Sequence, residues 1–221
     1  MLIPTGSKCL DSLLGGGVES GTVTQLYGHS GTGKTTICLM LARSLLENFD
    51  DFRVAYIDTE GLSTERIKQI FPDTSLFSNV YVYEVYEFKH QKNALKEAEK
   101  LCRTEKIKLL IVDSFTSLYR SELEDESRQV KVKRELTSQL TFLLGIARKY
   151  DLAVVITNQM FTDVRTGEDK PLGGTSIDHL SKIIVSLEKL GEFRRATLIK
   201  HRWLKEGRSC EYKITNRGIE P

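Results

Sequence analysis

The chain has 221 residues, of which 40% are hydrophobic, 28% are charged and only four are prolines. This composition excludes collagen-like, disordered and mucin-like proteins, and we expect residues 1–221 to fold as one soluble α/β domain. The 32 basic and 30 acidic residues leave a net charge of +2, which by itself favours neither a nucleic-acid coat nor a membrane-surface protein. Because no apolar stretch is long enough to span a bilayer and no secretory signal is present, we expect a cytoplasmic protein with no membrane partner.

Strands alternate with helices along the chain, which is the pattern of parallel βαβ units. The expected strands are 23–27, 54–57, 80–83, 109–112, 153–157, 183–187, 196–201 and 211–214, and the expected helices are 35–46, 64–71, 88–104 and 130–149. The uninterrupted apolar run at 109–112 indicates a central strand that is covered on both faces. The fold class predicted is therefore α/β, with a mostly parallel central sheet, antiparallel C-terminal strands and a polar loop over 159–174.

Four cysteines, Cys9, Cys38, Cys102 and Cys210, stand tens of residues apart and form no CxxC pair. This spacing suggests neither a zinc site nor a redox motif. We therefore expect four reduced thiols that fill core or surface positions, with Cys38 and Cys102 packing in helices.

Residues 28–35, with the sequence GHSGTGKT, match the phosphate-binding pattern GxxxxGK[ST] directly between a predicted strand and a predicted helix. In such a P-loop the glycines let backbone N–H groups surround a polyphosphate, and the helix N-terminus adds partial positive charge. Lys34 would reach the β- and γ-phosphate oxygens, and the Thr35 hydroxyl would ligate Mg²⁺. The predicted cofactors are ATP and Mg²⁺, and the predicted nucleotide-binding residues are Gly28, His29, Ser30, Gly31, Thr32, Gly33, Lys34 and Thr35.

Three further polar residues follow buried strands at the edge of the sheet where ligands of open α/β folds gather. Asp113 ends an apolar strand and, although such an Asp is often only a helix cap, beside a P-loop it is the predicted second metal ligand. Glu60 is the predicted base that activates water, in preference to Asp58, which lies nearer the strand body. Gln159 is predicted to sense the γ-phosphate; the alternative is a turn-forming Asn158 followed by an exposed Gln.

Several segments, in order, resemble the RecA-type recombinases of archaea and eukaryotes. They are TG at 5–6, LDSLLGGG at 10–17, the P-loop, YIDTEG at 56–61, LIVDS at 110–114, LYR at 118–120, VITNQ at 155–159 and LGG at 172–174. The resemblance covers nearly the whole chain. It implies a P-loop NTPase with a RecA-like core, MgATP as cofactor, DNA as partner and a role in homologous recombination and repair.

The chain departs from that family in two places. It begins at the ATPase core, without the N-terminal helical DNA-binding domain and the linker that carries the polymerisation motif. The loop at 160–172 is also shorter than the second DNA-binding loop of strand-exchange proteins and mixes acids with Arg165 and Lys170. We therefore expect a weak Mg-dependent ATPase that binds DNA as an accessory factor and could form a homo-oligomer, without long filaments or strand exchange of its own.

The stretch 189–208 holds seven basic and two acidic residues, a concentration of positive charge that the near-neutral sum hides. These residues could contact DNA phosphates, with Trp203 or Phe193 stacking on single-stranded bases; the alternative is a solvated hairpin with Trp203 in the core. The DNA expected is single-stranded or branched and bound without sequence preference.

Lys200, His201 and Arg202 allow a sharper hypothesis. On a strand, Lys200 and Arg202 would share a face and would contact either DNA or the γ-phosphate bound to a neighbouring subunit. In the segment 121–134, which corresponds by position to the first DNA-binding loop of the family, Arg128 and Lys131 are the predicted DNA contacts. Alternatively, the acids of this segment only occupy the first turn of the next helix.

Two other functions compete with an ATPase that binds DNA. The first is a nucleotide-gated interaction module, in which ATP binding only sets the conformation presented to recombination, nuclease or polymerase proteins. The second is a small-molecule kinase with a P-loop. That reading is disfavoured because such a kinase needs an Arg-bearing lid, whereas here Glu60 is placed for water.

Overall fold

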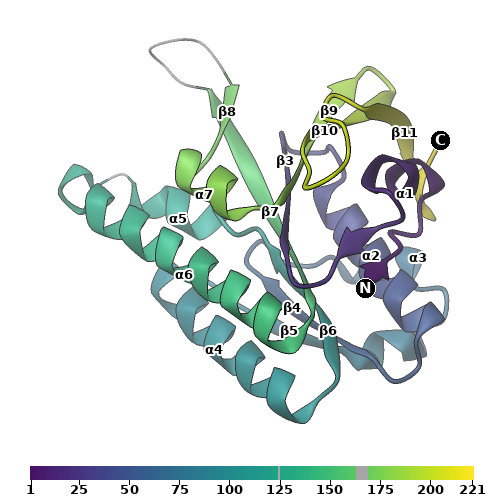
Figure 1. Ribbon diagram of the computed structural model, residues 1–221, viewed down its shortest axis with the longest axis horizontal. Coiled ribbons are helices and arrows are strands. Elements are labelled where there is room, and N and C mark those ends of the chain that lie inside the picture. Colours follow the sequence, from purple (N-terminus) through teal and green to yellow (C-terminus); the bar gives the residue numbers. More distant parts are fainter. Residues whose placement is uncertain (124, 163–168) are drawn as a thin grey trace.

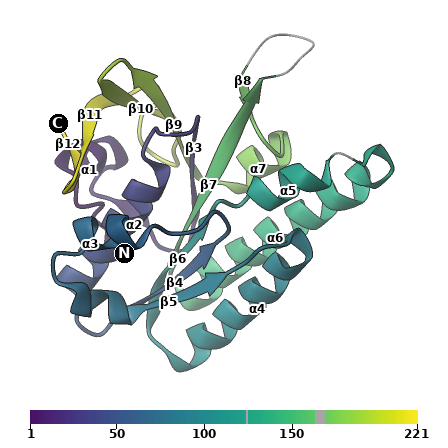
Figure 2. The same ribbon diagram turned by 180° about the vertical axis from the view of Figure 1, so that it is seen from behind.

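The computed structural model describes residues 1–123, 125–162 and 169–221, and within them the chain forms one large mixed sheet with helices on both faces (Figures 1 and 2). The strands are β1 (Leu2–Ile3), β2 (Val18–Glu19), β3 (Val23–Gly28), β4 (Arg53–Asp58), β5 (Val80–Glu84), β6 (Ile107–Asp113), β7 (Ala153–Thr162), β8 (Asp169–Pro171), β9 (Ile183–Leu190), β10 (Phe193–Lys200), β11 (Ser209–Thr215) and β12 (Gly218–Glu220). The α-helices are α1 (Lys8–Leu14), α2 (Lys34–Asn48), α3 (Thr64–Ile70), α4 (Phe88–Thr104), α5 (Ser117–Glu122), α6 (Gln129–Tyr150) and α7 (Thr175–Leu180). Among these described residues, no helix combines the length and apolar character that crossing a bilayer requires.

The sheet follows the order β12-β11-β10-β9-β3-β7-β6-β4-β5, and β8 pairs with β7 beside this path. The six strands β9, β3, β7, β6, β4 and β5 pair in parallel. Beyond β9, the strands β10, β11 and β12 extend the sheet in antiparallel order. The predicted fold class is thereby confirmed. Each expected strand and helix is present, with ends that differ by a few residues.

The hydrophobic core lies in two layers, one on each face of the sheet. Leu109 and Ile111 of β6 face the layer that contains α2, whereas Leu110 and Val112 face the layer under α4 and α6. All four side chains are fully buried. Successive strand residues point to opposite faces, so a strand covered on both sides is apolar without alternation.

Among the residues predicted as a loop over 159–174, residues 159–162 and 169–171 form strands, so the prediction was wrong for them, while residues 172–174 form a turn. β7 continues to Thr162 and pairs with β8 through Met160↔Pro171, Phe161↔Lys170 and Thr162↔Asp169, and α7 begins at Thr175. The outer end of β7 and β8 form a hairpin arm (160–162 and 169–171) that projects from the sheet (Figure 1). The reason is pairing: a polar segment forms a strand when a partner satisfies its backbone groups.

The expectation of four reduced thiols was wrong for two of the cysteines. Cys9 in α1 and Cys210 in β11 form a disulfide, while Cys38 and Cys102 are free thiols within helices. The bonded residues are separated by 201 positions. Only the tertiary fold, which packs α1 against β11, brings them together, and sequence spacing carries no sign of it.

Substitutions at two glycines test how closely the chain packs around α6 and between β3 and β9. A Cβ atom on Gly145 of α6 would meet nothing within 4 Å, whereas one on Gly28 would lie 2.3 Å from the Leu187 carbonyl oxygen. We expect Gly145→Ala to stabilise the protein by about 0.5–1 kcal/mol, because alanine loses less backbone entropy in a helix. Gly28→Ala should cost about 1–3 kcal/mol through crowding of the neighbouring strand. Denaturant unfolding of both variants measures the two changes, and equal stability for both would contradict the described fit of β3 against β9.

Candidate active site

The carboxyl ends of four parallel strands bring the predicted site residues to one edge of the sheet. The register pairs Gly28 of β3 with Gln159 of β7, and Asp58 of β4 with Asp113 of β6. Glu60 follows directly after β4. Because β3, β7, β6 and β4 are successive neighbours, the P-loop, Asp113, Glu60 and Gln159 come from adjacent positions along this edge.

The P-loop curls tightly between β3 and α2. Gly31 and Gly33 adopt φ angles of +75° and +99°, which favour glycine. The Thr32 hydroxyl donates to the His29 carbonyl at 2.9 Å, and the Lys34 Nζ donates to the carbonyls of Gly28 at 2.8 Å and His29 at 3.0 Å. The lysine ammonium is therefore held inside the loop by neutral oxygens, with no carboxylate as its hydrogen-bond partner among the described residues.

A pocket of about 500 Å³ opens over this loop. It is lined by Gly28, His29, Ser30, Gly31, Gly33, Lys34, Thr35, Thr36, Glu60, Arg120, Gln159, Met160 and Ile214. All the predicted P-loop residues except Thr32, together with Glu60 and Gln159, thus share one pocket. Thr32 is fully buried. Its hydroxyl donates to the His29 carbonyl and its own carbonyl accepts a hydrogen bond from Tyr212, so it stabilises the loop on the side away from the pocket.

Asp113 lies buried at the end of β6, beside the pocket. The Tyr56 hydroxyl of β4 donates to Asp113 Oδ2 at 2.8 Å, and the Thr157 hydroxyl of β7 donates to Oδ1 at 2.5 Å. The peptide bond between Asp113 and Ser114 is cis. Both flanking strands therefore contribute a hydroxyl that satisfies the buried carboxylate.

Charges within this cluster change one another's ionisation. Burial lowers the pKa of Lys34, while the nearby carboxylates of Glu60 and Asp113 act in the opposite direction. Burial also raises the pKa of the Glu60 carboxyl, and the charge of Asp113 raises it further. A carboxyl group with a raised pKa in a pocket that also contains an ammonium group is typical of a functional site.

The structure separates the roles of Glu60 and Asp58. Asp58 is buried, and its carboxylate accepts the backbone N–H groups of Glu60, Gly61 and Leu62, so it caps the turn after β4. Glu60 instead lines the pocket, where its Oε1 accepts a hydrogen bond from Gln159 Nε2. Of the two, Glu60 is the carboxylate that a bound phosphate or water could reach.

The alternative of a turn-forming Asn158 was wrong. Asn158 is fully buried within β7, and its Nδ2 donates to the Leu172 carbonyl at 2.9 Å. The Thr116 hydroxyl donates to Asn158 Oδ1 at 2.7 Å and accepts the Gln159 backbone N–H at 3.2 Å. Gln159 thus lies between the pocket and the hairpin arm, at a point tied to the segment before α5.

The donor set suits Mg²⁺ together with a polyphosphate. The hard oxygens are the Thr35 hydroxyl and the Glu60 carboxylate, which line the pocket, and the Asp113 carboxylate, which is buried beside it. No group of three or more His, Cys, Asp or Glu residues that could hold a metal occurs among the described residues. Mg²⁺ retains water and phosphate oxygens as ligands and needs few protein donors. The positive φ angles of Gly31 and Gly33 likewise shape a loop that admits phosphates.

The predicted pairing of Lys200 and Arg202 on one strand face was wrong. β10 ends at Lys200, whose Nζ donates to the carbonyls of Asp178 at 2.6 Å and Ser181 at 2.9 Å. Arg202 lies in the turn beyond and forms an ion pair with Glu19 at 3.1 Å. The register of β10 against β9 shifts between Leu198 and Lys200, and Arg202 lies beyond the last residue of the strand. The two cations therefore contact different parts of their own chain.

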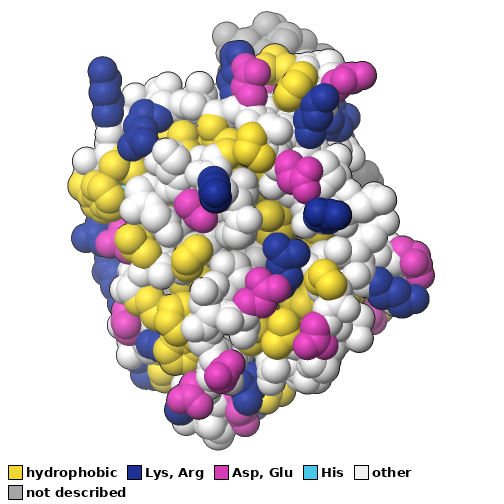
Figure 3. All heavy atoms as spheres, turned by 90° about the vertical axis from the view of Figure 1, so that its right-hand side faces the viewer, with side chains coloured by type: hydrophobic (Ala, Val, Ile, Leu, Met, Phe, Trp, Pro, Cys, Tyr) yellow, Lys and Arg dark blue, Asp and Glu magenta, His cyan; other side chains and the backbone are white. Residues whose placement is uncertain are grey.

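His201 and Trp203 lie in the same turn. The rings of His201 and Trp203 meet edge to face, and Trp203 is 59% exposed while it covers Gly15. The alternative that placed this indole in the core was therefore wrong. Figure 3, which views the side of the molecule where β10, β11 and α1 lie, shows basic and acidic side chains interspersed rather than one continuous basic patch.

The other predicted DNA contacts come from separate segments of the chain. Arg128 forms an ion pair with Glu122 at 3.2 Å, and Lys131 is exposed near the start of α6. Lys170 lies in β8, opposite Phe161. Arg165 falls outside the described residues.

Sequence patterns missed four residues that shape the site. Arg120 of α5 lines the P-loop pocket, with no hydrogen bond or ion pair from its guanidinium among the described residues, and Tyr212 of β11 donates to the Thr32 carbonyl at 2.8 Å. Tyr56 and Thr157 hold Asp113, as described above. For Tyr56 and Thr157 the sequence offered one signal, which is a hydroxyl side chain within an otherwise apolar strand. A hydroxyl that is buried in such a strand needs a hydrogen-bond partner, so the pattern indicates a buried polar contact.

A P-loop at the carboxyl edge of this mixed sheet, with antiparallel strands after the parallel ones, defines a RecA-like P-loop fold. The family model described as Rad51 matches residues 1–221, and the chain belongs to that family. The solved structure described as "Crystal structure of the RadB recombinase" superposes with a TM-score of 0.81 at 37% sequence identity, covering 99% of each chain.

Curated relatives resemble the chain along its whole length. A protein of Archaeoglobus fulgidus named "DNA repair and recombination protein RadB" is 73% identical over 221 residues, which cover 100% of this chain and 99% of that protein. A protein of the same name from Methanococcoides burtonii is 46% identical over 215 residues, covering 96% of this chain and 94% of the relative. The likeness foreseen from the sequence motifs is thereby confirmed.

Removal of one hydroxyl tests the hydrogen bonding of Asp113. Tyr56→Phe leaves one oxygen of a buried carboxylate without its donor, and we expect a loss of about 1.5–3 kcal/mol in the free energy of unfolding. Tyr86→Phe is the matched control, because the Tyr86 hydroxyl donates to the exposed Glu84 and its loss should cost less than about 0.5 kcal/mol. Denaturant unfolding measures both. Equal costs would show that Tyr56 is not needed to satisfy Asp113.

Proposed function

We propose that the chain binds MgATP in the P-loop pocket, hydrolyses it slowly, and binds DNA as an accessory factor of homologous recombination and repair. The observation that carries this proposal is the convergence of Lys34, Thr35, Glu60 and Gln159 on one pocket beside buried Asp113. The names of the RadB relatives support the recombination role. Strand exchange of its own is not part of the proposal.

Each residue has a part that follows from its position. Lys34 would neutralise phosphate charge at the floor of the pocket, and Thr35 and Asp113 would hold Mg²⁺, which supplies further charge neutralisation when bound. Glu60 would orient and deprotonate the attacking water. Gln159, whose amide contacts Glu60, would report whether a γ-phosphate is present.

Slow turnover fits the contact between Glu60 and Gln159. The amide of Gln159 donates to Oε1, which lowers the pKa of the Glu60 carboxyl and opposes the effect of burial. A carboxylate that is already hydrogen bonded is less free to accept a proton from water. The same contact supports the second candidate, a nucleotide-gated interaction module without significant turnover, because it links the pocket to β7 and the hairpin arm.

A groove next to the P-loop pocket is the proposed DNA site. It has a volume of about 630 Å³ and is lined by His29, Arg120, Leu123, Met160, Phe161, Thr162 and Leu172. His29, Arg120 and Met160 also line the nucleotide pocket. The Arg120 cation can contact a DNA phosphate there, and Phe161 offers a ring for a base.

Variants of the pocket test nucleotide binding and turnover separately. Lys34→Ala should abolish ATP binding, whereas Glu60→Gln should retain binding and lower turnover by about 100-fold, because only the base is lost. The wild-type rate should fall as the pH is lowered through the raised pKa of Glu60, since protonation removes the base. Glu65→Gln, on the exposed surface of α3, is the control. If Glu60→Gln hydrolysed ATP as fast as the wild type, the assignment of Glu60 as the base would be contradicted. If the wild type hydrolysed ATP no faster than Lys34→Ala while its binding to partner proteins still responded to ATP, the interaction module would be favoured.

Salt-dependent binding tests the DNA part of the proposal. Anisotropy of a labelled single strand should show affinity that falls with salt, and Arg120→Ala should lower the salt slope by about one. Lys131→Ala tests the start of α6, and Lys106→Ala is the control because Lys106 pairs with Asp51 beyond the opposite ends of the strands. Measuring DNA affinity with and without ATP shows whether the two ligands affect each other's binding. Light scattering on the same samples gives the size of the assembly. The absence of binding even at low salt would refute a DNA partner.

A further inference from the structure

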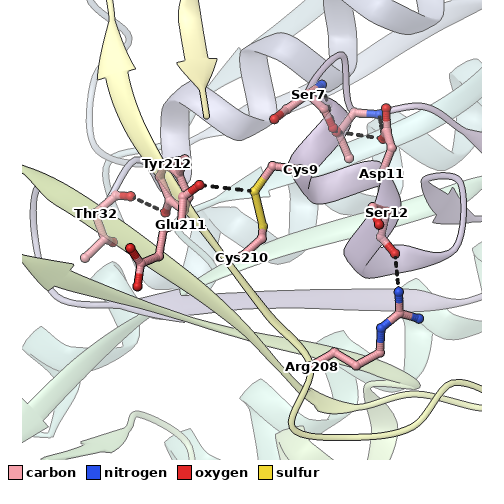
Figure 4. The surroundings of a disulfide bond; sticks show 10 residues. Ser7, Cys9, Asp11, Ser12, Thr32, Arg208, Cys210, Glu211 and Tyr212 are labelled. Carbon is pink, nitrogen blue, oxygen red and sulfur yellow. Dashed lines mark hydrogen bonds between the residues drawn. A yellow bond between two sulfur atoms is a disulfide. The ribbon is translucent and has the colours of Figure 1, made fainter.

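One face of β11 connects the disulfide to the P-loop (Figure 4). Residues two apart on a strand share a face, so Cys210, Tyr212 and Ile214 point the same way. Cys210 is bonded to Cys9, the Tyr212 hydroxyl donates to the Thr32 carbonyl at 2.8 Å, and Ile214 lines the nucleotide pocket. Three consecutive positions on this face thus contact α1, the base of the P-loop and the pocket wall.

The contacts with the P-loop are close. Tyr212 is fully buried, and burial raises the pKa of its hydroxyl well above the usual value, so the group remains a donor. A Cβ atom on Gly33 would lie 3.1 Å from Ile214 Cδ1, which shows how tightly β11 packs against the loop. A displacement of β11 by a fraction of an ångström would therefore move Tyr212 relative to Thr32 and widen the pocket.

α1 provides a firm support for the other end of the disulfide. Leu10, Leu13 and Leu14 of α1 are buried in the core, and the Arg208 guanidinium donates to the Ser12 carbonyl at 2.8 Å. Two thiol groups need more space between their sulfur atoms than a bonded pair. β11 is anchored as well, by the buried Tyr212 and by its pairing with β10 and β12, so the added space would be divided between α1 and β11. The part taken up by β11 would reach Tyr212.

We propose that Cys9–Cys210 is a reversible redox modification site for a dithiol reductant, and that the oxidised form holds the P-loop in the shape that binds nucleotide. The proposal rests on the nucleotide-binding function proposed above. Both cysteines are partly exposed, so a dithiol can reach the sulfur atoms.

The chemistry is thiol–disulfide exchange. A thiolate of the dithiol attacks one sulfur, the Cys9–Cys210 bond breaks, and a mixed disulfide forms. The second thiol of the reductant then releases the protein as two thiols, and the reductant becomes a disulfide after the transfer of two electrons and two protons. A small disulfide such as oxidised glutathione reverses the reaction in the same two steps.

The other two cysteines do not compete for this chemistry. Burial raises the pKa of Cys102 to about 11 and raises that of buried Cys38 well above its usual value. Both thiols are therefore protonated at neutral pH and are poor nucleophiles. Disulfide exchange would return the protein to the Cys9–Cys210 pair.

The test compares the oxidised and the dithiothreitol-reduced full-length protein. We expect reduction to weaken the binding of a fluorescent ATP analogue with Mg²⁺ by about fivefold or more. Hydrogen exchange without nucleotide should become faster at 28–35 and 209–215, but not at 107–113. Cys9→Ser/Cys210→Ser should behave as the reduced protein under both conditions, and Cys102→Ser should respond as the wild type does.

Tyr212→Phe isolates the proposed connection. Without the hydroxyl that contacts Thr32, the difference in affinity between the oxidised and reduced forms should shrink to about twofold or less. Equal affinity and equal exchange in the two wild-type forms would overturn the proposal, even if the double serine variant failed to fold. Redox-dependent exchange at 28–35 in a protein that binds no nucleotide in either form would instead overturn the nucleotide function and leave the link from the disulfide to the P-loop in place.

Discussion

The buried carboxylate of Asp113 sets the geometry of the whole site. A carboxylate removed from water is costly unless donors satisfy both of its oxygens, and here each flanking strand supplies one hydroxyl, from Tyr56 and Thr157. A shift of β4 or β7 by one residue would turn its hydroxyl to the other face of the sheet. The register of three central strands is therefore coupled to the hydrogen bonding of one buried side chain, and that register also positions Glu60 and Gln159.

The Lys34 ammonium and the carboxylates of Glu60 and Asp113 are held close together by this arrangement of the strands. Lys34 is buried, its ammonium donates to two P-loop carbonyls, and the carboxylates of Glu60 and Asp113 favour its charged form. The same nearness of Asp113 raises the pKa of Glu60. An anionic phosphate placed among these groups would contact the ammonium without displacing a carboxylate from it, because within the described parts of the chain Lys34 donates only to neutral oxygens.

What the sequence predicted, and what it did not, follows from the range of the interactions. The P-loop, the apolar strands and the carboxylates after them are local patterns, and the structure brings Lys34, Glu60 and Gln159 into one pocket as those patterns implied. The hairpin arm and the Cys9–Cys210 bond depend on partners that local periodicity does not reveal. Lys200 was misplaced for the same reason, since its carbonyl partners on and after α7 become neighbours only in the folded chain.

The P-loop is held by contacts from different parts of the chain. Tyr212 binds the Thr32 carbonyl, the Arg194 guanidinium approaches the Gly31 carbonyl at 3.4 Å, and the His29 ring pairs with Asp169 of the hairpin arm at 2.7 Å.

Two of the site contacts lead to the hairpin arm: His29 meets β8, and Gln159, which lies in β7, meets Glu60. A nucleotide that changes either contact changes the free energy of holding the arm in place. Thermodynamic linkage makes such an effect reciprocal. If a DNA strand bound between the arm and α5, it would change the affinity for nucleotide by the same factor as nucleotide changes the affinity for DNA. If nucleotide and DNA bind as proposed, these shared contacts would couple the two ligands without a large rearrangement of the sheet.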